Sequence, residues 1–195
     1  MLPLRSPEID ARYWVPLFLA SVLGTNLGDL YAHESGLSIG AGLALLTLLF
    51  GLILLAQARD SMPRALYYWT AIVLIRTAAT NIADFSAYRL HIPMALLSVA
   101  LAGWLVILAM MMRRERPGAA PVGALYWLAM LAAGTFGTVV GDALSMRFSV
   151  ELAAAALGLI WLTVFSVSPN RWLATAACYW SMVALTRTAG TAAGD

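Results

Sequence analysis

The chain has 195 residues, of which 62% are apolar and only 11% are charged, and its mean hydropathy is +0.81. This composition excludes a soluble monomer and is typical of an integral membrane protein. The net charge of +2 is too small to indicate a nucleic-acid partner, and all twelve basic residues are arginine, so a lysine Schiff base is excluded.

Seven apolar stretches follow one another along the chain, each near the length of about 20 residues that crosses a bilayer as a helix. Open strands would leave backbone groups unpaired in lipid, so we expect helices throughout. The stretches cover residues 12–32, 37–57, 65–88, 92–112, 122–146, 150–168 and 172–194. The sequence therefore predicts an all-α membrane protein with seven transmembrane helices, in one transmembrane domain over residues 1–195.

Arginines predict the orientation, because short loops that are rich in arginine stay in the cytoplasm. The N-terminus and the links after the second, fourth and sixth stretches carry Arg5, Arg12, Arg59, Arg64, Arg113, Arg114, Arg116 and Arg171. The opposite links carry only Arg89 and Arg147. We therefore expect a multi-pass protein whose N-terminus lies in the cytoplasm.

One motif occurs four times, always on an odd-numbered stretch: Tyr-Trp, ten residues, Thr, and Asp four residues after the Thr. The copies are Tyr13-Trp14…Thr25…Asp29, Tyr68-Trp69…Thr80…Asp84, Tyr126-Trp127…Thr138…Asp142 and Tyr179-Trp180…Thr191…Asp195. They indicate parallel repeats over about 12–57, 65–112, 122–168 and 172–195, the last one incomplete. The pattern predicts an eighth helix after it, and the Arg-Thr-Ala shared by the second and fourth copies suggests a pseudo-twofold axis normal to the membrane.

Four tandem repeats of two membrane helices, each with a marked tryptophan, resemble a family of bacterial membrane proteins named only for a repeat of unknown function. The resemblance covers nearly the whole chain and fits its architecture, and the eighth helix missing from the sequence departs from it. It implies a multi-pass protein of the bacterial inner membrane and brings no settled activity.

The repeated aspartates lie at one predicted depth, since 15 helical residues separate each from its Trp, which is roughly 22 Å. Each motif Thr lies one turn below its Asp on the same helix face. The resulting set of candidate ligands is Asp29, Asp84, Asp142, Asp195, Thr25, Thr80, Thr138 and Thr191, with Asn26 and Asn81 beside the first two Thr.

Carboxylate, hydroxyl and amide oxygens are hard ligands that suit Na⁺, Mg²⁺, Ca²⁺ or Mn²⁺. The sequence thus predicts a cation site, with Asp29 and Asp84 as its metal ligands because an Asn accompanies each of them. A buried carboxylate can equally carry a proton. The alternative is structural: each Asp caps the following helix or pairs with a loop group.

Arg76 and Arg187 lie eight residues before their Asp, close to the predicted midplane, where a charge is most costly. Helical side chains lean toward the N-terminus, so we expect both arginines to lean away from their own Asp. They either reach the cytoplasmic side or bond backbone groups, or they hold an anionic substrate or act in gating.

Small residues at a spacing of four predict that the motif helices form the inner layer of the bundle. The pairs are Gly24 and Gly28, Ala79 and Ala83, Gly137 and Gly141, and Gly190 and Gly194. The Tyr-Trp pairs are expected to be membrane-interface anchors or packing residues, and the alternative is an aromatic cage or a pigment contact.

Internal repeats and intramembrane charge favour a small transporter or exporter that binds a cation or small polar solute, with or without proton coupling. The alternative is a non-transporting subunit or assembly partner of a larger membrane complex, and a homo-oligomer is compatible with either. No nucleophile–base pair is visible, so an enzyme is not expected, and no cofactor is predicted. A cavity that reaches the Asp level would favour transport, whereas a dry bundle would favour the subunit.

Overall fold

The computed structural model describes Pro7, residues 9–34, Gly36, and residues 38–59, 64–112, 122–167 and 175–194. The described residues form helices and contain no strand, which confirms the predicted all-α class. The helices are α1 Ala11–Glu34, α2 Ile39–Arg59, α3 Arg64–Asp84, α4 Met94–Met111, α5 Ala124–Phe148, α6 Val150–Val167 and α7 Ala176–Gly194. Asp195 and five of the arginines that predict the orientation lie outside the described residues: Arg5, Arg113, Arg114, Arg116 and Arg171.

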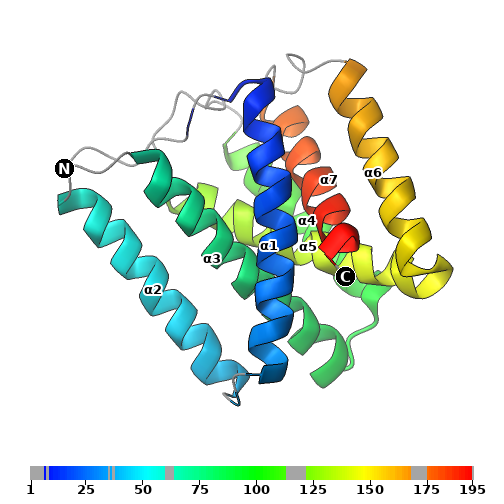
Figure 1. Cartoon of the computed structure of the whole chain (residues 1–195), viewed down its shortest axis with the longest axis horizontal. Helices are drawn as coiled ribbons and strands as arrows, with labels where there is room; N and C mark the ends of the chain where they lie inside the picture. Colours follow the sequence, from blue (N-terminus) through cyan, green and yellow to red (C-terminus); the bar gives the residue numbers. More distant parts are fainter. Residues whose placement is uncertain are drawn as a thin grey trace.

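The four motif helices form an inner ring in which α1 packs against α3, α3 against α5, α5 against α7, and α7 against α1. The other three helices lie outside this ring: α2 packs on α3, α4 on α5 and α6 on α7 (Figure 1). In the most apolar part of α5, 61% of residues are buried, against 11% in α2 and in α4. The motif helices are therefore the inner layer, as the small residues predict.

Small residues hold the ring together because they leave no room for a side chain between neighbouring helices. A methyl group on Gly24 of α1 would lie 2.4 Å from Cγ of Arg76 on α3. One on Gly137 of α5 would lie 2.7 Å from Cβ of Arg187 on α7. One on Gly190 of α7 would lie 2.4 Å from Cβ of Ser21 on α1.

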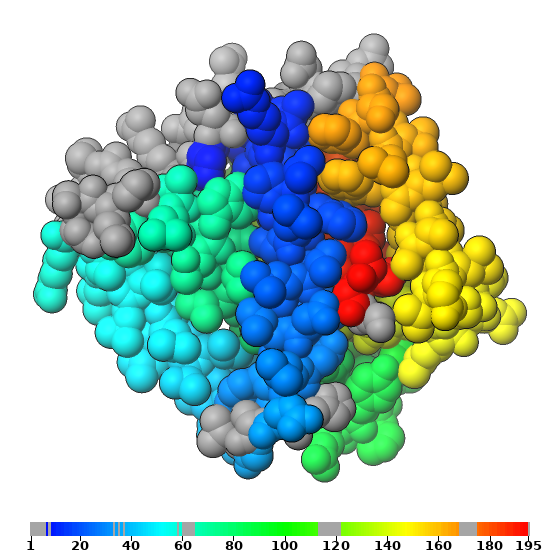
Figure 2. Space-filling model, viewed as in Figure 1, coloured from blue at the N-terminus to red at the C-terminus, as the bar shows by residue number. Residues whose placement is uncertain are grey.

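In the part of the chain that the structure describes, five helices are long and apolar enough to cross a bilayer by length and composition alone: α1, α2, α4, α5 and α6. Their outward faces carry exposed leucines, and Figure 2 shows α1 running across one face of the molecule between α2 and α6. On α1, Leu19, Leu23 and Leu30 are each at least half exposed. The outward apolar surface and the five apolar helices are thus consistent with a helical membrane protein.

The end of α3 differs from the single apolar stretch predicted over residues 65–88. The α-helix ends at Asp84 and continues as one π-helical turn, η1 Phe85–Arg89. The chain then turns at His91, whose φ is 53°, and Pro93 precedes α4. The wider π turn displaces the end of this helix and brings Tyr88 and Arg89 to the mouth of the bundle, where they line the cavity described below.

Candidate functional site

The functional candidates lie in levels along the axis of the inner ring, because each motif helix presents a row of residues spaced by four. On α1 this row is Tyr13, Leu17, Ser21, Thr25 and Asp29. The other three motif helices present the corresponding residues at the same levels: Tyr68, Ile72, Arg76, Thr80, Asp84; Tyr126, Met130, Gly134, Thr138, Asp142; and Tyr179, Val183, Arg187, Thr191.

The first level is a cluster of four tyrosine hydroxyls, which we call the tyrosine cluster. It lies on the axis of the bundle, at one end of the inner ring. The Oη atom of Tyr13 lies 2.7 Å from that of Tyr68, 3.0 Å from that of Tyr179 and 3.3 Å from that of Tyr126. The hydroxyl of Tyr126 also contacts those of Tyr68 and Tyr179. One end of the ring is therefore joined by hydrogen bonds among four equivalent side chains.

The motif tryptophans support the tyrosine cluster from outside. Each tyrosine ring packs edge-on against the Trp that follows it, with centroids 5.0–5.3 Å apart. It also packs against the motif Trp of the adjacent helix, for example Tyr13 against Trp69 at 5.5 Å. The Tyr-Trp pairs are thus packing residues of the ring, and the membrane-anchor interpretation is wrong for the tyrosines because their hydroxyls meet at the axis.

The second level seals the bundle. Leu17, Ile72, Met130 and Val183 lie one turn beyond the tyrosines, and all four side chains are fully buried. An apolar layer of this kind excludes water between the tyrosine cluster and the charged level above it.

Arg76 rises from the third level and places its guanidinium among all four motif threonines, which we call the threonine ring. Its Nη1 donates to Oγ1 of Thr80 at 3.2 Å and of Thr138 at 2.7 Å, and to the carbonyl of Gly134 at 3.1 Å. Its Nη2 donates to Oγ1 of Thr25 at 2.8 Å and of Thr191. The side chain is fully buried, so these acceptors replace the water that the charge has lost.

Arg187 begins at the same level as Arg76 but points the other way. Its Nη1 donates to Oγ of Ser21 at 3.1 Å, and its Nη2 contacts Sδ of Met130, one level closer to the tyrosines, at 3.7 Å. Its Nε has no hydrogen-bond partner, and the side chain is fully buried. Arg187 is therefore a buried cation with far fewer oxygen acceptors than Arg76.

The expected lean of both arginines away from their Asp is right for Arg187 and wrong for Arg76. The reason lies on the neighbouring helices. Arg187 meets Ser21 and Met130, whereas the corresponding positions next to Arg76 hold Gly134 and Leu17, which offer no side-chain acceptor. Arg76 therefore finds its oxygen acceptors only in the other direction, at the threonine ring.

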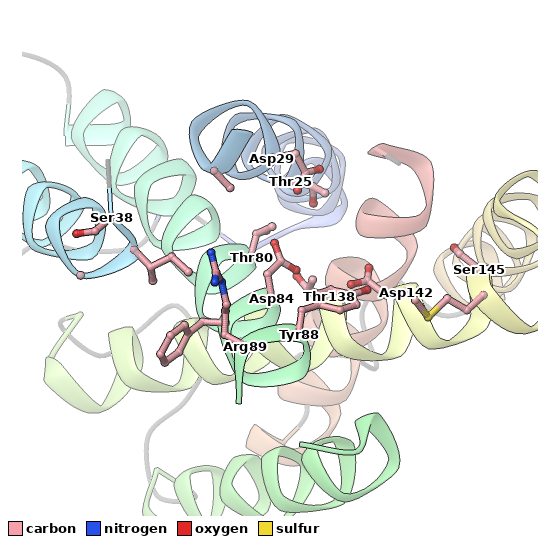
Figure 3. Close-up of a pocket in the computed structure, with 15 residues that line it drawn as sticks. Thr25, Asp29, Ser38, Thr80, Asp84, Tyr88, Arg89, Thr138, Asp142 and Ser145 are labelled. Carbon is pink, nitrogen blue, oxygen red and sulfur yellow. The ribbon is translucent and has the colours of Figure 1, made fainter. Parts of the chain in front are cut away.

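A cavity of about 990 Å³ extends from the threonine ring to the aspartate end of the bundle. Its lining includes Thr25, Thr80 and Thr138 at the inner end, and Asp29, Asp84 and Asp142 one turn further out, where the carboxylates are partly exposed (Figure 3). The structure thus brings together three of the predicted aspartates and three of the predicted threonines in one cavity. Thr191 is linked to these threonines because its hydroxyl also accepts a hydrogen bond from Arg76.

The mouth of the cavity carries residues that the sequence analysis did not select. Tyr88 and Arg89 of η1 line it beside Asp84, and Ser38 and Ser145 contribute hydroxyls from the ends of α2 and α5 (Figure 3). Among the described residues that line the cavity, Arg89 is the only cation, against three carboxylates, while the guanidinium of Arg76 closes the inner end. The cavity is therefore acidic overall, with one basic residue at its rim.

Two predicted ligands lie away from the cavity. Asn26 is exposed, and its Nδ2 donates to the carbonyls of Val22 and Gly194, so it bridges α1 and α7. Asn81 is buried, and its Nδ2 donates to the carbonyl of Thr77. Each follows its Thr by one residue, which turns it about 100° away from the axis. Neither amide is therefore among the described residues that line the cavity with Asp29 and Asp84.

The carboxylates are spread around the cavity wall. Among the residues that the structure describes, no three His, Cys, Asp or Glu side chains gather closely enough to hold a metal ion. The prediction of Asp29 and Asp84 as metal ligands therefore gains no support from this arrangement, which suits a larger cation or a hydrated ion better than a compact metal centre.

Comparison with known proteins gives no relative to compare the cavity with: no protein family, no curated protein and no solved structure matches the chain.

Proposed function

We propose that the protein is a small membrane transporter or exporter whose solute is a cation or small polar molecule bound in the aspartate- and threonine-lined cavity. The observation that carries this proposal is the cavity itself, since three equivalent carboxylates line a space of about 990 Å³ inside a membrane bundle. Ionisable groups at membrane depth are costly, and a water-accessible cavity is the setting in which solute pathways use them.

The charge of the lining favours a cation. Three carboxylates face the cavity against one arginine at the rim, and the threonine oxygens at the inner end accept hydrogen bonds from a buried guanidinium. A volume near the upper end of ordinary ligand sites accommodates an organic ammonium compound or a hydrated ion. The carboxylates could exchange a proton for the solute, which would couple its movement to the proton gradient.

Two barriers separate the cavity from the other end of the bundle, as alternating access requires. The first is Arg76 in the threonine ring, and the second is the tyrosine cluster with its apolar layer. In our proposal all seven helices cross the inner membrane of a bacterium, with the N-terminus in the cytoplasm. The chain is then a member of the four-repeat family it resembles, and its cavity opens away from the cytoplasm.

Transport in proteoliposomes tests the proposal. The purified protein is reconstituted, and uptake of labelled monovalent ions, divalent ions and organic amines is measured with and without a proton gradient. Asp29→Asn, Asp84→Asn and Asp142→Asn should each reduce uptake of the transported solute at least tenfold while the protein elutes as a folded species. Glu151→Gln is the matched control, because Glu151 is exposed on α6 and is not among the cavity residues.

The alternative is a non-transporting membrane subunit. It is favoured by the tight packing of the other end of the bundle, where the apolar layer and the tyrosine cluster fill the axis. The same variants discriminate between the two functions. If no solute class is taken up, and the Asp→Asn variants reduce only the abundance of folded protein, the carboxylates serve packing and the subunit replaces the transporter.

A further inference from the structure

The threonine ring has the hydrogen-bond polarity of a cation site. Each hydroxyl donates its single hydrogen to the backbone carbonyl four residues earlier on its own helix, over 3.0 Å for Thr25, 3.1 Å for Thr191, and 3.4 Å for Thr80 and Thr138. A hydroxyl that has donated its only hydrogen can face the axis only as an acceptor. Four such oxygens at one level form a ring of lone pairs.

The present occupant of the ring is a cation that belongs to the chain. The guanidinium of Arg76 donates to all four hydroxyls and to the carbonyl of Gly134, and every one of these groups is buried. No single helix provides this site, because the four oxygens come from α1, α3, α5 and α7. The ring is thus a completed site, filled by a tethered ligand.

We propose that the threonine ring is a binding site for a monovalent cation, and that Arg76 is the tethered occupant that a transported cation must displace to pass beyond the cavity. The displacement step rests on the function proposed above, whereas the affinity of the ring for a cation does not. The ring lies one turn below the aspartates, so a cation drawn in by the carboxylates meets it next.

The chemistry of the ring limits the charge of its ligand. All four side-chain ligands are neutral hydroxyls, which replace the hydration shell of one positive charge but do not offset the much larger dehydration cost of a divalent ion. The ligands that fit are alkali ions and small ammonium or guanidinium groups, and the two kinds are separated by experiment below.

The alternative positions for Arg76 explain why the ring is filled at rest. In the direction taken by Arg187, Arg76 would meet Gly134 and Leu17 instead of a hydroxyl and a thioether. A displaced Arg76 would therefore be a poorly solvated buried charge. The binding of an incoming cation to the ring thus has to offset the free-energy cost of moving Arg76 to that position. Arg76 is therefore a barrier to the passage of cations beyond the cavity.

Chemical rescue tests the ring as a site. Arg76→Ala empties it, and the thermal unfolding of the purified full-length variant is followed while methylguanidinium, guanidinium, methylammonium, Na⁺ or K⁺ is added at low millimolar concentration, with choline as a cation too large for the ring. We expect one of these small cations to raise Tm, by about 5–11 °C at about a hundredfold excess over its Kd. The wild type should show no such rise, because Arg76 fills its ring.

Two controls locate the effect. Arg76→Ala combined with Thr25→Val and Thr138→Val should lose the rescue, since two of the four acceptors are gone. Arg187→Ala should not be rescued by any of the cations, because Arg187 lies outside the ring. Arg76→Met, which keeps the length of the apolar stem, repeats the titration if Arg76→Ala yields too little folded protein.

The outcomes separate the ring from the transport proposal. The ring is refuted if neither Arg76 variant is stabilised by any small cation, or if the double Thr→Val background is rescued equally well. Rescue by alkali ions rather than by guanidinium compounds assigns the ring to alkali ions, and the reverse result assigns it to organic cations. Rescue without uptake in proteoliposomes would support the cation site and refute the transport function. Uptake without rescue would refute the ring as a cation site and support the transport function.

Discussion

Removing the hydroxyl of Thr138 tests the central feature of the bundle, the solvation of a buried guanidinium by the threonine ring. Thr138 accepts from Arg76 Nη1 at 2.7 Å. Thr138→Val keeps the side-chain shape, and it leaves one N–H of a buried cation without that acceptor.

The expected loss follows from the charge of the donor. A hydrogen bond to a charged group contributes about 1.5–3 kcal/mol, and side-chain bonds measured inside membrane bundles reach about 1.7 kcal/mol. We therefore expect Thr138→Val to lower the free energy of unfolding by about 1.5 kcal/mol. For a chain of this size that lowers Tm by about 3–6 °C.

Thr135→Val on the same helix is the matched control. Thr135 is also buried, and the hydrogen bond found for its hydroxyl is to the carbonyl of Leu131 on its own helix. We expect a Tm change below about 1 °C, since that carbonyl keeps its helical bond. Thermal unfolding in nanodiscs, followed by the fluorescence of the seven tryptophans, measures both variants. Equal losses for the two valines would refute the special role of the ring.

Three further expectations concern packing, the tyrosine cluster and topology. Gly137→Ala should lower the free energy of unfolding by about 1–3 kcal/mol, because the new methyl group would lie 2.8 Å from a backbone atom of α7. Gly51→Ala is the control, since a methyl group there has open space and should cost nothing; thermal unfolding compares the two variants. Tyr13→Phe removes a hydroxyl with three hydrogen-bond partners and should lower Tm by several degrees. Tyr31→Phe is the control and should leave Tm unchanged, since the Tyr31 hydroxyl has no hydrogen-bond partner. A reporter enzyme fused after Arg116 should behave as cytoplasmic, and periplasmic activity there would reverse the proposed orientation.

The helices and their inner layer were predictable because both follow from local features of the sequence. Apolar runs of membrane length give the seven helices, and small residues at a spacing of four mark the faces that touch. The turn at Phe85–Arg89 was not predictable, because the spacing of apolar residues in 65–88 does not distinguish a π turn from continued α-helix. Its contribution of Tyr88 and Arg89 to the cavity was missed with it.

The tyrosine cluster was missed for a different reason, although its residues were part of the motif. On a straight helix a row spaced by four drifts about 40° at each step, so Tyr13 and Asp29 would face different directions. They share the axis only if the helices cross so that rows of i and i+4 residues interlock, which is a property of the packed ring. The constant spacing of Tyr, Thr and Asp in all four copies was the available signal.

The direction of each arginine could not be deduced from its own helix, since both carry the same Arg-Thr-Ala segment. Two guanidinium groups in one threonine ring would lie within about 5 Å, which costs about 3 kcal/mol at an effective dielectric constant of about 20. Only one can therefore occupy it, and the choice depends on the neighbouring helices. Ser21 gives Arg187 a hydroxyl where Gly134 gives Arg76 none, so Arg76 takes the ring. The side chains that differ between α1 and α5 at these positions thus decide which cation closes the inner end of the cavity.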